Sequence, residues 1–284
     1  MPAVFNYLDW GEERPEALRR SSEASTTAST APSTNLSTLQ WILDVDRGHG
    51  SRDLDYIRRQ EQEFDTRSKS AVAEIFLNPN FHRWMTIDAS DLLYIEGRFE
   101  RESGKTTPIS YFCAELVQKL KSQPRMTTSI LHFFCGQHVA FNDPLRGPRG
   151  LMRSLITQCL RIWPTVSLAE LDLSSFSGKH DSIPMQDLCS LFQIIVGQMR
   201  PQSTVICIVD DILRLEKDEW ASEYWMLMGM LEQMVEGSGA GLLFKVMMTS
   251  PGASKWLRGE AGVGPNHRVI VTDSGVPVRR RAWK

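Results

Sequence analysis

Four consecutive residues, Gly104, Lys105, Thr106 and Thr107, carry the clearest chemistry in the chain. An apolar run at 92–95 precedes them, and an amphipathic stretch follows them. Backbone N–H groups at the start of a helix attract an anion, a lysine reaches the outer phosphates of a nucleotide, and a hydroxyl group holds Mg²⁺. This order of strand, loop and helix predicts a phosphate-binding loop.

The glycine spacing of this loop is stretched. In the usual pattern a glycine stands five residues before Gly104, but that position holds Phe99. The nearest glycine on that side is Gly97, two residues further back. Glu100 and Glu102 stand where a phosphate would approach, and each carboxylate near a triphosphate is repulsive by about 1 kcal/mol or more. The function therefore depends on whether the stretched loop still holds a nucleotide.

Two further runs end in polar residues suited to a nucleotide site. The run 204–209 is apolar and leads into Asp210 and Asp211. A buried strand that ends in an acid has the form of a Walker B strand, whose carboxylate holds Mg²⁺ directly or through water. A parallel strand that ends in an ordinary solvated aspartate has the same form.

The run 244–251 ends in hydroxyl residues that suit a sensor of the terminal phosphate, and an ordinary polar turn explains them equally well.

From these elements we predict that the cofactor is ATP or GTP with Mg²⁺, without a preference for either base. Thr106 and Asp210 are the expected Mg²⁺ ligands, and no catalytic residue is assigned. The expected nucleotide-binding residues are Gly97, Ser103, Gly104, Lys105, Thr106 and Thr107.

The chain from residue 91 onward predicts an α/β fold. Short apolar runs alternate with amphipathic stretches, and the runs are apolar on both faces, as in a parallel sheet covered by helices on both sides. The expected strands are 92–95, 130–135, 205–209, 242–248 and 268–271, and the expected helices are 108–121, 149–162, 184–199 and 219–235. We therefore predict a P-loop NTPase-like three-layer sandwich with a five-stranded parallel sheet.

Four segments are expected along the chain. Residues 1–37 form a mostly disordered leader, because Ser, Thr, Ala and Pro dominate its second half and cannot bury enough apolar surface. Residues 38–88 form a helical extension, residues 89–273 form the NTPase-like domain, and residues 274–284 form a basic tail.

Composition disfavours several classes of protein. A net charge of −2 shows no basic field, so nucleic acid is not an expected partner. No segment approaches the ~20 apolar residues that span a bilayer, so no membrane partner is expected. The five cysteines are scattered without a C-x-x-C pair, which is typical of reduced thiols in a cytoplasmic protein.

In order and spacing, several stretches resemble the nucleotide-binding domain of STAND-class P-loop NTPases, most closely the NACHT or nephrocystin-like N-terminal module abundant in filamentous fungi. The stretches are 38–44, 80–84, 95–106, 150–160, 205–211 and 246–251. The resemblance implies a sheet in which one strand separates the phosphate-loop strand from the Walker B strand. It also implies that nucleotide state is coupled to oligomerisation, so protein partners or self-association are expected. Such proteins carry sensor domains after this module, whereas this sequence stops just after the core sheet, so a truncated paralogue, a fragment of a longer protein or a stand-alone remnant is expected.

Three departures from the family pattern concern binding and hydrolysis. The phosphate loop has two added residues and lacks its middle glycine. Leu213 and Arg214 stand where the family has an acidic pair that positions the attacking water, and no arginine follows Ser250. Groups of this kind are worth several kcal/mol of the barrier to phosphoryl transfer. Asp211 is the remaining nearby carboxylate, and in an extended strand it would point away from the face of Asp210. At most a slow NTPase is expected.

Two functions remain open from the sequence. The first is a nucleotide-binding switch module of a STAND or NLR-like signalling protein with weak or no hydrolysis. The alternative is a pseudo-NTPase scaffold that binds no nucleotide and acts through protein–protein interaction. Retention of Lys105, Thr106 and Asp210 favours the first, and the altered loop favours the second.

Overall fold

The computed structural model describes residues 32–98, 106–122, 127–167, 183–237, 241–254 and 267–273. Its centre is a five-stranded sheet whose hydrogen-bonded neighbours are all parallel. The strands are β1 (Asp91–Arg98), β2 (Thr128–Phe134), β3 (Thr204–Asp210), β4 (Leu243–Ser250) and β5 (His267–Asp273). The predicted α/β fold and its five strands are confirmed.

The strand order is β2-β3-β4-β1-β5. Strand β4 therefore lies between β1, which leads into the predicted phosphate loop, and β3, which ends at Asp210. This is the order that the family resemblance implied. It places the carboxyl ends of β1, β4 and β3 side by side at one edge of the sheet, where open α/β sheets bind their ligands.

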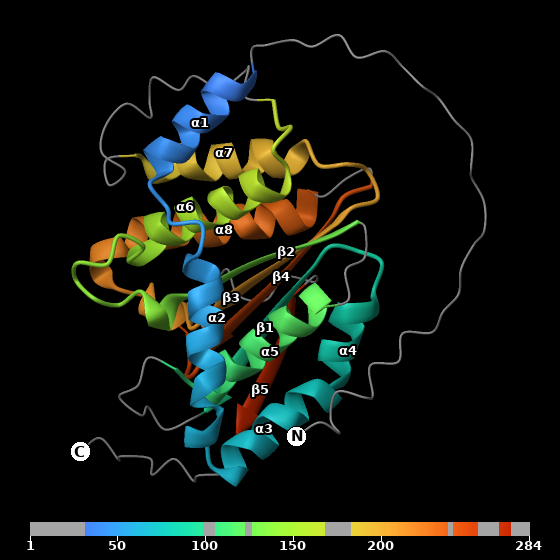
Figure 1. Cartoon of the computed structure of the whole chain (residues 1–284). Coiled ribbons are helices and arrows are strands. Elements are labelled where there is room, and N and C mark those ends of the chain that lie inside the picture. Colours follow the sequence, from blue (N-terminus) through green and yellow to red (C-terminus); the bar gives the residue numbers. More distant parts are fainter. Residues whose placement is uncertain are drawn as a thin grey trace.

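Helices cover both faces of this sheet (Figure 1). The four helices that the sequence predicts after residue 91 are present as α5 (Pro108–Ser122), α6 (Gly147–Ile162), α7 (Met185–Gly197) and α8 (Ala221–Gly237). Helices α6, α7 and α8 pack on one face and α5 on the other. Because successive strand residues point to opposite faces, strands buried between two such layers must be apolar throughout, and β3 is buried from Val205 to Asp210.

Four helices precede the sheet and share its two cores. They are α1 (Pro32–Leu43), α2 (His49–Arg59), α3 (Thr66–Leu77) and α4 (Pro79–Thr86). Helix α1 packs in the core formed by α6, α7 and α8, whereas α2, α3 and α4 pack with α5 on the opposite face (Figure 1). The side chains of Asp65 and Asn78 accept backbone N–H groups at the starts of α3 and α4, which fixes where these helices begin.

Helix α1 begins at Pro32, inside the range 1–37 that the sequence suggests is a disordered leader. Leu39 and Leu43 are fully buried against the sheet domain, which explains why the helix forms next to a segment rich in Ser and Thr. Residues 1–31 and the basic tail 274–284 lie outside the described residues.

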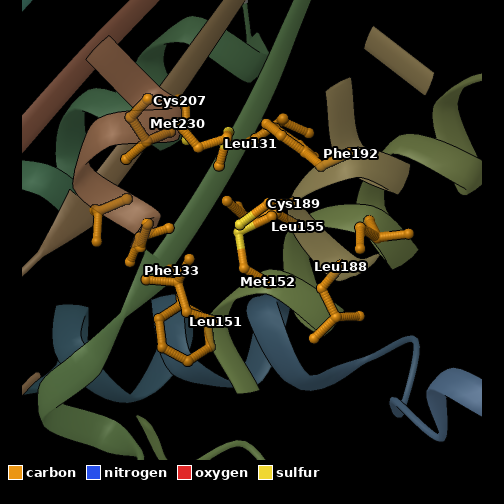
Figure 2. Packing of buried hydrophobic residues seen from close by; sticks show 14 of the residues in the cluster. Leu131, Phe133, Leu151, Met152, Leu155, Leu188, Cys189, Phe192, Cys207 and Met230 are labelled. Carbon is orange, nitrogen blue, oxygen red and sulfur yellow. The ribbon is translucent and has the colours of Figure 1, made fainter. Parts of the chain in front are cut away.

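The larger core is apolar and closely packed (Figure 2). Leu131 and Phe133 of β2 meet Leu151 and Met152 of α6, and Phe192 of α7 completes the layer (Figure 2). All five cysteines are free and buried, and burial raises the pKa of each thiol. None of the helices in the described part of the chain has both the length and the apolar character needed to cross a bilayer.

Candidate functional site

The residues expected to bind a nucleotide divide into two groups. Gly97 lies near the end of β1, and Thr106 and Thr107 lie immediately before α5. The other three, Ser103, Gly104 and Lys105, fall outside the described residues, as do Phe99, Glu100 and Glu102. The geometry of the site therefore rests on Gly97, on the start of α5 and on the ends of β3 and β4.

Helix α5 begins with a reciprocal cap between Thr107 and Ser110. The backbone N–H of Thr107 donates to Ser110 Oγ at 3.1 Å, and the backbone N–H of Ser110 donates to Thr107 Oγ1 at 3.1 Å. Pro108 occupies the first helical position, where a missing N–H does no harm. Such a cap fixes the start of a helix in the manner of a capping box. The hydroxyl of Thr107 is thus engaged in holding the helix start.

Asp210 lies at the end of β3, 2% exposed, directly beside this helix start. Its Oδ1 accepts a hydrogen bond of 2.6 Å from Thr249 Oγ1, and its carboxylate also hydrogen-bonds the side chain of Ser110. Burial, with the adjacent charge of Asp211, raises the pKa of Asp210 to about 7. Ser110 therefore connects the two predicted halves of the site, the start of α5 and the Walker B strand.

The donor set at this edge fits Mg²⁺. Thr106 and Asp210 offer a hydroxyl and a carboxylate oxygen, the ligand types that Mg²⁺ prefers. Asp210 is buried, and its partners Thr249 and Ser110 are neutral, so an arriving cation would stabilise the charged carboxylate. Together with the phosphates of a nucleotide, these oxygens would form a partial coordination shell.

Asp211 differs from its expected geometry. The ladder between β2 and β3 ends at Asp210, and Asp211 takes a left-handed backbone with φ 53° and ψ 55°. The expectation that it continues an extended strand is wrong, so the alternation of side chains along a strand no longer decides where Asp211 points. Arg214 Nε donates to Asp211 Oδ2 at 2.8 Å, so the residue that replaces the family acid is bound to the neighbouring carboxylate.

Strand β4, the predicted sensor strand, contacts the two acids of the site through Thr249 and not through Ser250. Thr249 Oγ1 donates to Asp210 and accepts the backbone N–H of Asp211 at 3.3 Å, so one hydroxyl bridges both acids. Ser250 Oγ accepts from Tyr94 Oη at 2.5 Å and donates to the carbonyl of Gly252 at 2.5 Å. This arrangement fixes the chain after β4 on β1.

Sequence reasoning missed three residues of this edge. Ser110 follows Thr107 at the spacing of a helix cap, which could have identified it. Gln137 follows β2 at the carboxyl edge, where ligand-binding residues of parallel sheets collect, and its Nε2 donates to Thr106 Oγ1 at 3.2 Å. Glu216 accepts hydrogen bonds from Tyr224 Oη at 2.9 Å and from Ser254 Oγ, a pairing that no sequence pattern indicates.

Comparison with protein families adds a decisive match. The family model described as Nephrocystin 3, N-terminal matches residues 71–251, which is most of the chain. The chain belongs to this family. The match to the Nephrocystin 3, N-terminal family includes every strand from β1 to β4, together with Gly97, Thr106, Asp210 and Thr249. It supports a P-loop NTPase-like domain and does not extend to β5.

Other comparisons are more distant. No curated protein matches the chain. A chain in the structure of Drosophila ORC bound to DNA is similar at 12% identity and a TM-score of 0.35, covering 91% of this chain and 52% of that one. The Walker-type ATPase of Pyrococcus abyssi is similar at 13% identity and a TM-score of 0.34, covering 82% and 57% respectively. The chain thus spans a little over half of either structure, and neither likeness assigns it a ligand or a partner.

Proposed function

We propose that this chain is a Mg²⁺-dependent nucleotide-binding module that acts as a switch with weak or no hydrolysis. The observation that carries the proposal is the position of Asp210, buried at the end of β3 and joined through Ser110 to the start of α5. In this position its carboxylate and the hydroxyl of Thr106 would hold Mg²⁺ against the phosphates. Lys105, by its place in the sequence, would contact the outer phosphates.

The same edge supports slow chemistry. Hydrolysis needs a group that orients or deprotonates water in line with the terminal phosphate. Leu213 and Arg214 lack such a group. Arg214 Nε donates to Asp211 Oδ2 at 2.8 Å, so the Asp211 carboxylate is engaged in this bond and is a poor base for activating water. Bound triphosphate would therefore persist, as a switch requires.

We further propose that residues 89–273 hold the nucleotide and that the helices within 38–88 transmit its state to protein partners or to a second copy, in the manner of STAND and NLR-like proteins. Family membership supports this proposal, together with the packing of α1 and of α2–α4 into the two opposite cores of the sheet domain. ATP and GTP remain equal candidates.

A titration of the full chain with fluorescent ATP and GTP analogues, with Mg²⁺ and with EDTA, tests the proposal. Binding that requires Mg²⁺ and is lost in Lys105→Ala and Asp210→Asn supports it. Asp55→Asn is the matched control, since Asp55 is an exposed aspartate on α2. An unchanged affinity in both site variants would contradict it.

One observation favours the second candidate, a scaffold that binds no nucleotide. Thr249 Oγ1 donates to Asp210 Oδ1 at 2.6 Å, so a hydroxyl of the protein itself already satisfies one of the two carboxylate oxygens that could bind Mg²⁺. Absence of binding to either analogue at millimolar concentration, in a folded protein, would establish this alternative.

A further inference from the structure

The contact between Gln137 and Thr106 joins two elements that are far apart in the sheet order. Gln137 ends a short 3₁₀ turn, η3 (Cys135–Gln137), which follows β2 at the outer edge of the sheet. Its Nε2 reaches the hydroxyl of Thr106, before α5, at 3.2 Å. A threonine hydroxyl has two lone pairs and one proton, so a bond from Gln137 leaves one lone pair for a cation. The contact thus orients the hydroxyl without blocking it.

The turn that carries Gln137 is held by a buried histidine, His138. Its Nε2 lies 3.1 Å from Asp53 Oδ2 of α2, and its Nδ1 lies 3.1 Å from Asp143 Oδ2 in the following loop. The ring also stacks on Phe133 of β2, with centroids 4.8 Å apart and planes inclined by 22°. An imidazole donates to a carboxylate at both nitrogens only when both carry a proton. Burial lowers the pKa of His138, but its bond to Asp53 and the two acidic charges outweigh burial and raise it.

Other charged groups face this histidine from the elements around it. His49 of α2 lies with its ring centroid 6.2 Å away, and it is itself fixed by Ser154 Oγ at 2.6 Å. Arg214 and Lys217, from the loop after β3, line the same small cavity as His138. Burial lowers the pKa of His49, and Asp53 and Asp143 are the two acids that bond to the His138 ring.

Helix α2 also bonds to α5, the helix that begins just after Thr106. Arg58 Nε donates to Glu115 Oε1 of α5 at 2.7 Å, one turn and a half beyond Asp53 on the same helix. Asp53 thus fixes the η3 turn and Arg58 fixes α5, while Leu54 and Ile57 between them are buried in the core shared with α5. Helix α2 therefore bonds both to His138, which follows the η3 turn, and to α5, which begins just after Thr106.

We propose that Gln137 is a positioning residue for the Thr106 hydroxyl, and that α2 sets this position through Asp53 and Arg58, so that docking of α2 and binding of Mg²⁺-nucleotide are coupled. The inference rests on the proposed function. Coupling is reciprocal, so a nucleotide that requires the positioned hydroxyl stabilises α2 by the same factor by which docked α2 raises affinity.

The test uses the full chain and three variants: Gln137→Ala, Asp53→Asn and the control Asp55→Asn, which makes the same chemical change on the exposed side of α2. Affinity for a fluorescent nucleotide analogue is measured with Mg²⁺ and with EDTA. Gln137→Ala should lower the Mg²⁺-dependent affinity roughly three- to tenfold, the range for one lost hydrogen bond. It should leave the EDTA value unchanged, a separation that general loss of structure would not give. Asp53→Asn should act in the same direction, and Asp55→Asn should have no effect.

Hydrogen exchange separates failure of the inference from failure of the proposed function. Without any nucleotide, Asp53→Asn should speed exchange at the start of α5, including the Tyr111 amide that donates to Thr107 O, relative to Asp55→Asn. Equal exchange in these two variants, or equal losses of affinity with Mg²⁺ and with EDTA in Gln137→Ala, would overturn the coupling. If the parent protein binds no nucleotide but the exchange difference is present, the proposed function and the positioning role of Gln137 are overturned. The structural role of α2, through Asp53 and Arg58, is then retained.

Discussion

Two neighbouring carboxylates at the end of β3 lie in opposite surroundings. Asp210 receives hydrogen bonds from the neutral hydroxyls of Thr249 and Ser110, and its pKa is raised to about 7. Asp211 is bound to the guanidinium of Arg214 at 2.8 Å. The first is a buried acid with neutral hydroxyl partners, and the second is paired with a cationic side chain of the protein. Two adjacent acids of one strand end can therefore differ in charge state, because one has neutral partners and the other a guanidinium.

The largest expected effect comes from removing the charge of Asp210. The folded protein keeps this proton up to about pH 7, whereas an ordinary aspartate loses it near pH 3.8. Between these values the folded state binds more protons than the unfolded state, so its free energy of unfolding falls as pH rises. Asp210→Asn should therefore stabilise the apoprotein at pH 8 by on the order of 3 kcal/mol, while abolishing Mg²⁺-dependent binding. Denaturant unfolding at pH 5 and pH 8 measures this. Equal pH dependence in parent and variant would show that Asp210 is ionised throughout.

The next effect concerns the partner of Asp211. Arg214→Ala removes the guanidinium and leaves a carboxylate that is 1% exposed, which should cost about 1–3 kcal/mol. The double variant Arg214→Ala with Asp211→Asn should recover most of that loss, because position 211 then carries no buried charge. A denaturation cycle over the four proteins gives the coupling energy. Additive losses would mean that the Arg214–Asp211 pair contributes no coupling energy to stability. The two acids would then be alike in having no stabilising cationic partner.

A smaller effect is expected from the hydroxyl that bridges both acids. Thr249→Val keeps the shape of the side chain but removes the donor to Asp210 and the acceptor for the Asp211 amide. The loss should be about 1–2 kcal/mol at pH 8, and smaller at pH 5, where Asp210 is protonated and needs the donor less. Thr249→Ser is the control that keeps the hydroxyl. A loss independent of pH would assign the effect to packing alone.

The sequence predicted those parts of the molecule that depend on local pattern. The apolar runs and the spacing of amphipathic stretches were sufficient for the strands and for the helices after residue 91, whereas the strand order came from the family resemblance. The start of α1 at Pro32 was not predicted from the sequence. Leu39 and Leu43 are buried by α6 and the helices beside it, and an argument from local composition does not include such distant contacts.

The candidate site was predictable in part. Thr106 and Asp210 were named from their places beside a strand and a helix. The left-handed backbone of Asp211 was missed, because the end of β3 depends on where its neighbours stop pairing. The contact of His138 with Asp53 joins residues 85 positions apart, and no periodic pattern indicates such a pair. The contributions of Ser103, Gly104 and Lys105 stay predictions.

The most direct test of the account measures binding and hydrolysis in the same sample. Purified full-length protein is mixed with Mg²⁺ and ATP or GTP, and thermal stability and phosphate release are recorded together, with Lys105→Ala as the control. We predict a nucleotide-dependent rise in stability, about 2.7 kcal/mol at a hundred times the Kd, and turnover far below ~1 s⁻¹. Turnover well above that value in the parent, lost in Lys105→Ala, would contradict the claim that Asp211 is withdrawn from catalysis. Absence of any stabilisation would contradict the proposal that Asp210 holds Mg²⁺ together with a nucleotide.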